Sequence, residues 1–212
     1  MSDSRIEING IGKKFGRRRI FENVNFVFGK GEPSGIAGHN GAGKSTLVKI
    51  IANVISPNEG ETVYYHQNAK LEKEKIFERI GFVAPYLVLY SEFSPLENLR
   101  FFSEIRGIEF NLARAEELLK TFNIYKRRND YLRGFSSGML QRMKFVFALY
   151  HNPDFLLLDE PTSNLDEEGK RTVYELTKKL AQEKVVIIAS NESNDLALCG
   201  KILELEKFKK KK

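Results

Sequence analysis

The stretch Gly38 to Thr46, GHNGAGKST, combines glycines with a lysine and a serine at the spacing of a phosphate-binding loop. Gly38, Gly43, Lys44 and Ser45 occupy the fixed positions of G-x-x-x-x-G-K-[ST]. Glycines let such a loop bring its backbone N–H groups close to an anion. Lys44 would reach the β- and γ-phosphates of a nucleotide, and Ser45 would give its hydroxyl to Mg²⁺. The loop's predicted nucleotide-binding positions are Gly38, Asn40, Gly41, Ala42, Gly43, Lys44, Ser45 and Thr46.

A glycine-rich turn that contains Lys-Ser by chance is the alternative interpretation of this stretch. It fits less well, because an apolar run over residues 34–38 precedes the loop and a helix-like segment follows it. A strand, loop and helix in that order are the context that the motif requires.

The second chemical candidate is Phe155-Leu-Leu-Leu-Asp-Glu160, in which four apolar residues end in two acids. A buried strand of this kind carries its carboxylates to the carboxyl edge of a sheet, where α/β folds bind ligands. Asp159 is predicted to hold Mg²⁺, directly or through water, and Glu160 to orient and deprotonate the attacking water. An acidic strand end alone is often only a solvated turn. Its pairing with the phosphate loop favours catalysis.

Between these two motifs lies FSSGM, Phe135 to Met139. Ser136 and Ser137 are expected at the N-terminus of a helix, where hydroxyls, backbone N–H groups and the helix dipole point together at an anion. A simple helix cap explains the same residues and does not compete with that interpretation.

Together these motifs resemble the ATP-binding subunits of ABC transporters, whose signature, usually LSGGQ, is FSSGM here. The resemblance covers nearly the whole chain. Phe15 matches the aromatic residue that stacks on adenine, and Asp166 ends the loop after the catalytic glutamate. The resemblance implies a head-to-tail dimer, formed by two copies of this chain or by this chain and a related cassette. In that dimer Ser136, Ser137 and Gly138 would contact the nucleotide bound by the other protomer. The implied cofactors are ATP and Mg²⁺, and without ATP the chain should be mostly monomeric.

Two positions depart from the family pattern. Pro85 aligns with the usual glutamine, and Asn191 with the usual histidine after the last long apolar run. Proline has no polar side chain for Mg²⁺ or water. Asparagine keeps a hydrogen-bond donor for a γ-phosphate but has no proton to titrate near neutral pH. Asn191 is therefore expected to assist catalysis by positioning.

The strands and helices expected around these residues indicate an α/β fold. We predict a P-loop NTPase core with a mainly parallel sheet, an N-terminal antiparallel β subdomain and an inserted helical subdomain. Residues 1–212 are expected to form one domain, with the core lobe at 1–85 and 150–212 and the helical subdomain at 86–149. Strands are expected at 6–15, 20–28, 61–66, 80–84, 155–158, 185–189 and 202–205. Helices are expected near 44, at 94–105, 111–122, 138–150 and 167–183.

Two of these helices have specific sequence signals. Ser94-Pro-Leu-Glu97 has the form of a capping box, with Gly107 as the stop. The helix at 111–122 is expected to place Leu112, Ala115, Leu118 and Leu119 on one apolar face.

Composition limits the possible environments. The chain has 212 residues, 42% of them hydrophobic, but its apolar runs are far shorter than a bilayer span. The N-terminus does not have the form of a signal peptide. A single cysteine, Cys199, excludes an internal disulfide. The net charge of +6 is partly due to the basic run from Lys207 to Lys212, expected to be a solvated end. No nucleic-acid partner is expected.

The resemblance implies an ATPase that moves an integral membrane permease supplied by another chain, through the surface around residues 85–92. The chain is then expected in the cytoplasm, peripheral on the inner face of the membrane. The short sequence after the last predicted strand resembles export-type systems, including haem-exporter ATPases. The alternatives are a non-transport ABC ATPase acting on nucleic acid or the ribosome, and a nucleotide-binding switch with little hydrolysis. Intact Glu160 argues against the switch. The membrane subunit, rather than this chain, would choose the substrate.

Overall fold

The computed structural model describes residues 4–209. Residues 1–3 and the last three lysines of the basic run lie outside the described residues. Within 4–209 no helix is both long and apolar enough to cross a membrane. The strands are β1 (Arg5–Phe15), β2 (Arg18–Phe28), β3 (Ser34–Ala37), β4 (Glu59–His66), β5 (Ala69–Lys70), β6 (Ile80–Val83), β7 (Phe155–Asp159), β8 (Val185–Ser190) and β9 (Lys201–Glu204). The helices are α1 (Lys44–Ile51), α2 (Lys73–Arg79), α3 (Pro95–Arg106), α4 (Leu112–Thr121), α5 (Ser137–Tyr150), α6 (Glu167–Ala181) and α7 (Ser193–Leu196).

The strands form two sheets, and the predicted α/β class is confirmed. The antiparallel sheet has the order β2-β1-β4-β5, and the other sheet has the order β6-β7-β8-β3-β9 with parallel pairing throughout. Strands β7 and β8 are buried along their whole length, as continuous apolar runs in a covered parallel sheet require. The residues that follow β3, β7 and β8 therefore emerge at one edge of this sheet.

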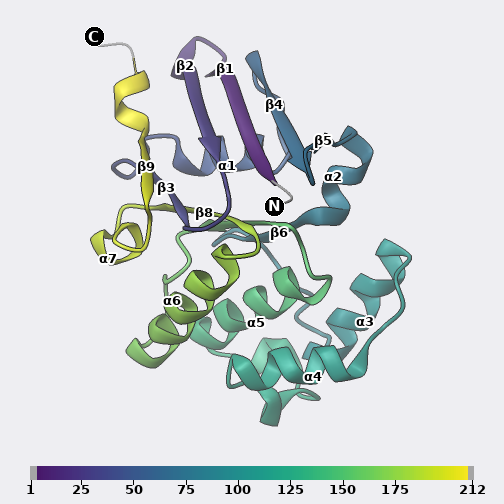
Figure 1. Cartoon of the computed structure of the whole chain (residues 1–212). Coiled ribbons are helices and arrows are strands. Elements are labelled where there is room, and N and C mark those ends of the chain that lie inside the picture. Colours follow the sequence, from purple (N-terminus) through teal and green to yellow (C-terminus); the bar gives the residue numbers. More distant parts are fainter. Residues whose placement is uncertain (1–3, 210–212) are drawn as a thin grey trace.

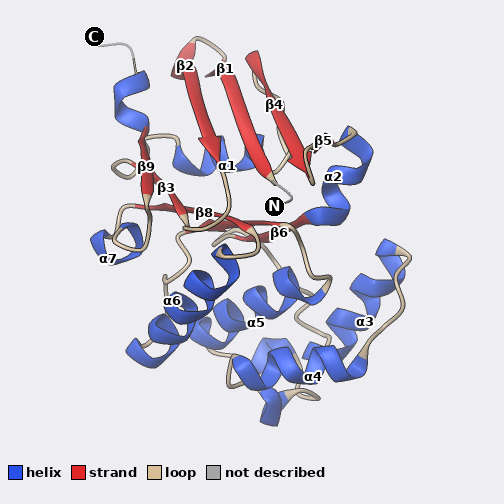
Figure 2. Cartoon of the chain, in the orientation of Figure 1, coloured by secondary structure: helices blue, strands red, loops and turns tan. Residues whose placement is uncertain are grey.

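Two hydrophobic cores lie on opposite sides of the parallel sheet. The first joins residues of α1 and the antiparallel sheet to one face, with Phe21, Phe28 and Phe155 among its largest members. The second joins the helical region to the other face through residues such as Phe122 and Phe145. Figure 1 shows α1 between the two sheets and helices α3 to α6 on the far side of the parallel sheet. Figure 2 shows the same separation of strands and helices.

The helical region begins as its sequence signals predict. The Ser94 side chain accepts from the Glu97 N–H, the Glu97 carboxylate accepts from the Ser94 N–H, and Gly107 ends α3 in the left-handed region. On α4 the predicted apolar face is correct for Ala115, Leu118 and Leu119 but wrong for Leu112, which is exposed. As the first residue of the helix, Leu112 lies beyond the reach of the core that covers the later turns.

Two short helices were not anticipated. Helix α2 has a single buried residue, Ile76, so its sequence has no periodic apolar pattern. Helix α7 has only four residues and buries Asp195. A buried acid is not a signal that hydrophobic periodicity can detect.

Candidate nucleotide site

The phosphate loop joins β3 to α1, as predicted. Gly43 caps α1 with φ 106°, and a Cβ there would lie 2.6 Å from Ile20 Cγ2. Only glycine combines this backbone with such close packing. The Lys44 side chain, 5% exposed, donates from Nζ to the Gly38 carbonyl at 2.8 Å. The lysine thus lies folded over the loop whose backbone would hold an anion.

A cavity of about 360 Å³ opens over this loop. Its lining residues are Arg18, Ile20, Asn40, Gly41, Gly43, Lys44, Ser45, Thr46 and Glu160. The cavity therefore brings most of the predicted loop residues together with the predicted base. Arg18 and Ile20 are new, because β2 precedes the loop in sequence and only the tertiary fold brings it near.

Of the predicted nucleotide-binding residues near this loop, Phe15, Gly38 and Ala42 do not line the cavity. Phe15 ends β1 beside the turn to β2 and is 53% exposed as a residue, and the Lys13 ammonium lies 5.0 Å from the ring centroid. Ala42 is fully buried and contributes backbone only, with its N–H bonded to the His39 carbonyl. An exposed ring is available for stacking.

Asp159 is fully buried, and neither of its carboxylate oxygens has a hydrogen-bond partner within residues 4–209. Burial raises its pKa, while the neighbouring Ser45 and Tyr86 hydroxyls and Lys44 act to lower it. Those hydroxyls lie near the carboxylate without forming a hydrogen bond of good geometry to it. A buried, unpaired carboxylate is costly unless a ligand completes it.

These groups fit Mg²⁺. A hard cation of this size takes one or two protein oxygens and completes its shell with phosphate and water. Ser45 and Asp159 supply such oxygens. Among residues 4–209 no cluster of three or more His, Cys, Asp or Glu side chains could hold a metal by itself.

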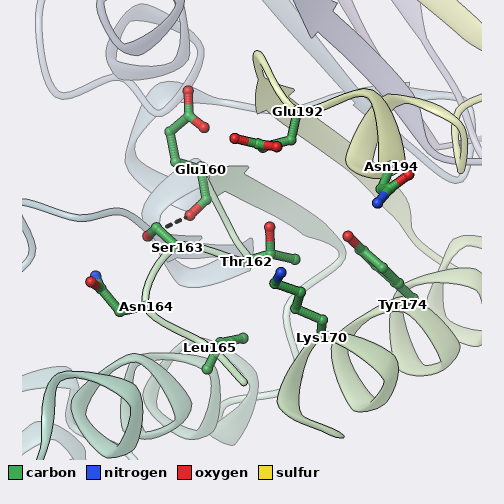
Figure 3. Close-up of a pocket in the computed structure, with 9 residues that line it drawn as sticks. All are labelled: Glu160, Thr162, Ser163, Asn164, Leu165, Lys170, Tyr174, Glu192 and Asn194. Atoms are coloured by element: carbon green, nitrogen blue, oxygen red, sulfur yellow. Dashed lines mark hydrogen bonds between the residues drawn. The ribbon is translucent and has the colours of Figure 1, made fainter. Parts of the chain in front are cut away.

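Glu160 follows β7 with φ 48°, an unusual backbone for a residue with a side chain. Its N–H donates to the Ala189 carbonyl at 2.8 Å, and its carbonyl accepts from Ser163 Oγ at 2.9 Å. These bonds hold a conformation that costs on the order of 1–3 kcal/mol, and such conformations cluster at functional sites. Glu160 Oε1 lies 3.3 Å from Lys44 Nζ. Figure 3 shows Glu160 turned away from the Thr162 and Tyr174 side chains.

The signature residues line a second cavity, of about 380 Å³, together with the loop after β7. Its lining is Ser136, Ser137, Gly138, Met139, Arg142, Asn164 and Asp166. Ser136 caps α5 by accepting from the Met139 N–H at 3.3 Å. A Cβ on Gly138 would lie 2.8 Å from the Asn164 carbonyl, so glycine is required for this contact.

Asp166 connects two of the elements that line this second cavity. It accepts from the Gly169 N–H at 2.9 Å, which caps α6, and from Arg142 Nη2 at 2.6 Å. Both contacts lower its pKa, the backbone bond first. Arg142, on α5, thus links the signature helix to the loop after Glu160. None of these signature residues lines the cavity over the phosphate loop.

The two departures from the family pattern are both exposed. The Pro85 carbonyl accepts from Lys144 Nζ at 2.8 Å, and the next residue, Tyr86, turns toward Asp159 with the Lys49 ammonium 3.8 Å from its ring centroid. Sequence reasoning missed Tyr86, which follows a strand that carries no other signal of chemistry. Asn191 follows β8 and lines neither cavity.

The chain is similar to known proteins of one family. The ABC transporter family model matches residues 21–163. ABC transporter ATP-binding protein NatA of Bacillus subtilis is 32% identical over 190 residues, which cover 87% of this chain and 77% of NatA. Linearmycin resistance ATP-binding protein LnrL of the same bacterium is 31% identical over 185 residues, covering 86% of this chain. The chain belongs to the ABC transporter family. It spans 60% of the length of LnrL.

Solved structures agree with the fold. A dimeric structure of MJ0796, a bacterial ABC transporter cassette, superimposes with a TM-score of 0.81 at 28% identity, covering 95% of each chain. A second structure of the same cassette, with the same TM-score, identity and coverage, is described as a post-hydrolysis state bound to ADP and Pi.

Proposed function

We propose that this chain binds and hydrolyses ATP as the motor subunit of an ABC transporter. The observation that carries the proposal is the meeting of Lys44, Ser45 and Glu160 in one cavity, with the unpaired carboxylate of Asp159 behind it. This set provides an anion cradle, two metal ligands and a carboxylate base, which are the parts that phosphoryl transfer to water requires.

In this proposal each residue has one role. The loop N–H groups and Lys44 bind the β- and γ-phosphates, while Ser45 and Asp159 hold Mg²⁺, which when bound neutralises charge on the phosphates. Glu160 accepts a proton from the attacking water through its carboxylate. Asn191, one residue beyond the Ser190 side chain that contacts Glu160, positions the γ-phosphate or the water.

The separate signature cavity supports a dimeric active site. Ser136, Ser137 and Gly138 line a cavity distinct from the one at the phosphate loop, so they are free to face a nucleotide on another protomer. The MJ0796 cassette has been solved as a dimer. We therefore propose that two copies, or one copy and a related cassette, close head to tail around two ATP molecules.

A third cavity, of about 340 Å³, supports a membrane partner. The groove is lined by Pro85, Leu87, Val88, Leu89, Ser91, Leu132, Arg133, Phe135, Leu140 and Lys144. Val88 is 88% exposed. Exposed apolar grooves with a polar rim are typical of protein interaction sites. The groove joins the segment after β6 to the signature region, so a permease bound here would sense closure of the dimer from the cytoplasmic face of the membrane.

The direction of transport is proposed as export. LnrL is named for resistance to linearmycin. Resistance by export is the simplest use of an ATP-driven permease, and the sequence resemblance to export-type systems agrees with it. The transported substrate would be chosen by the permease.

The test is co-purification from detergent-solubilised membranes. The tagged chain should retain a multi-span membrane protein, and Val88→Asp should lose it while keeping ATP affinity. Val54→Asp, another exposed valine placed after α1, is the matched control and should keep the partner. Recovery of ribosomal RNA without a membrane protein would instead favour the nucleic-acid alternative.

A further inference from the structure

A buried carboxylate outside the predicted catalytic set lies close to Glu160. Asp195, on α7, is 0% exposed and accepts hydrogen bonds from three hydroxyl groups. Thr162 Oγ1 lies 2.9 and 3.1 Å from its two oxygens, Tyr174 Oη lies 3.0 Å from Oδ1, and Ser190 Oγ lies 2.7 Å from Oδ2. These donors come from the loop after β7, from α6 and from the end of β8.

These three hydrogen bonds compensate the burial of the carboxylate. Burial of a carboxylate is costly unless hydrogen bonds compensate it, and bonds to an ionised group are roughly twice as strong as neutral ones. Three elements are therefore fixed to one another around Asp195. Figure 3 shows two of the donors, Thr162 and Tyr174, which line the same pocket as Glu160.

Ser190 connects this cluster to the predicted base. Its Oγ lies 2.7 Å from Asp195 Oδ2 and 3.3 Å from Glu160 Oε2, and it accepts from the Glu192 N–H at 3.0 Å. The single proton of the Ser190 hydroxyl is shared between the two carboxylates in a three-centre hydrogen bond, and the shorter branch goes to Asp195. Asp195 thereby fixes the atom that contacts Glu160.

Within residues 4–209, the side chains that bind the Glu160 carboxylate are Lys44, at 3.3 Å, and Ser190. The phosphates of a bound nucleotide would compete for Lys44, since they also attract its ammonium. Ser190 is then the side chain that still restrains Glu160 while the water reacts. A base misplaced by about 1 Å can lose on the order of 10²-fold in rate.

We propose that Asp195 is a positioning residue that acts through Ser190 to hold Glu160 in its catalytic orientation. The inference rests on the proposed role of Glu160 as the base. It assigns a function to a buried acid that the phosphate loop, the metal ligands and the signature residues do not use.

The experiment is a double-mutant cycle of Asp195→Asn with Glu160→Gln, read by single-turnover ATP hydrolysis. Asp195→Asn preserves shape but replaces one acceptor oxygen with a donor. We expect hydrolysis to fall about tenfold, as expected for loss of one hydrogen bond to a charged group, with ATP affinity unchanged. In the Glu160→Gln background the same change should have no further effect, because the two residues act in series.

Two further variants separate positioning from loss of stability. Tyr174→Phe removes a donor to Asp195 that does not touch Ser190 or Glu160, and it should hydrolyse ATP at the wild-type rate. Ser190→Ala removes one hydroxyl and should slow hydrolysis with unchanged ATP affinity, so it carries the test if Asp195→Asn does not fold. The proposal would be overturned if Asp195→Asn slowed hydrolysis as much in the Glu160→Gln background as in the wild type. It would also be overturned if Tyr174→Phe slowed hydrolysis as much as Asp195→Asn does. Glu160→Gln with wild-type hydrolysis would instead overturn the role of Glu160.

Discussion

Lys44 Nζ and Glu160 Oε1 lie 3.3 Å apart, so the predicted phosphate-binding lysine and the predicted base form an ion pair. The lysine comes from the start of α1 and the glutamate from the end of β7, and both project from the same edge of the parallel sheet. A γ-phosphate that binds Lys44 must compete with this carboxylate. Nucleotide binding and release of the base are therefore coupled through one ammonium group.

Lys44→Ala should weaken ATP binding roughly 10- to 100-fold, because it removes a charge-assisted contact to the phosphates. Isothermal titration calorimetry measures the affinity directly. Lys75→Ala, which removes an exposed lysine on α2, is the control and should bind ATP normally. Unchanged affinity in Lys44→Ala would remove the phosphate loop from the proposed site.

Phe15→Ala should weaken ATP binding more modestly than Lys44→Ala, because stacking on a base contributes about 1–3 kcal/mol. The ring is largely exposed, so the free energy of unfolding should change little. Phe21→Ala provides the contrast, since this fully buried ring should cost roughly 3–5 kcal/mol of stability. A Phe15→Ala protein destabilised to the same degree would mean that Phe15 serves the core instead.

His151 should make stability depend on pH. Its pKa is lowered from 6.5 to about 4, chiefly by burial and also by the nearby Arg106 and Lys184 charges, while the bond from Nε2 to the Ile80 carbonyl opposes the shift. Its Nδ1 is buried without a partner in the described residues, so a second N–H there would have no acceptor. Between pH 6.5 and about 4 the unfolded chain binds a proton that the folded chain does not.

The contribution of neutral His151 is therefore complete above pH 6.5 and decreases as the pH falls to about 4, by about 3 kcal/mol in total. Urea unfolding at several pH values measures it. His151→Phe cannot titrate, so the difference in unfolding free energy between wild type and variant should change across this range and stay constant above it. A difference that does not vary with pH would contradict the burial argument.

Local signals in the sequence predict local structure well here. The Ser94 capping box and the Ser136 cap both form, because each is decided within four residues. The apolar runs at β7 and β8 are likewise sufficient to predict a parallel sheet. Helix α2 was not predicted because Ile76 is its single buried residue, so its sequence lacks an apolar period. Leu112 was predicted to be buried, and is exposed, because periodicity does not show where a core ends.

The residues of the site likewise divide into those that local motifs predict and those that only the tertiary fold brings near. Most of the phosphate-loop residues predicted from the motif meet Glu160 in one cavity. Arg18, Tyr86 and Asp195 were missed because each is remote in sequence from the motif it adjoins. No pattern along the chain reports that Tyr86, three residues beyond β6, faces Asp159. Nor does any pattern report that an acid on a four-residue helix is buried near Glu160.

Glu160→Gln should bind ATP normally but lose hydrolysis by about 10²-fold or more, because the amide cannot accept the proton of the attacking water. The variant should accumulate an ATP-bound dimer, visible by size-exclusion chromatography. Wild-type protein, assayed with its membrane partner, should release phosphate much faster. Equal rates for the two would make the chain a nucleotide-gated switch.

Asn191 should assist this reaction by hydrogen bonding rather than by titration. Asn191→His keeps a donor at the end of β8, so turnover should stay the same or rise, whereas Asn191→Ala removes the donor and should slow turnover. Steady-state phosphate release at saturating ATP measures both variants, and Asn194→Ala, an exposed asparagine on α7, is the control. The Asn191 side chain has no protein hydrogen-bond partner within residues 4–209, so its removal should leave the unfolding free energy nearly unchanged. Wild-type turnover in Asn191→Ala would show that Glu160 and the loop position the water without help from Asn191.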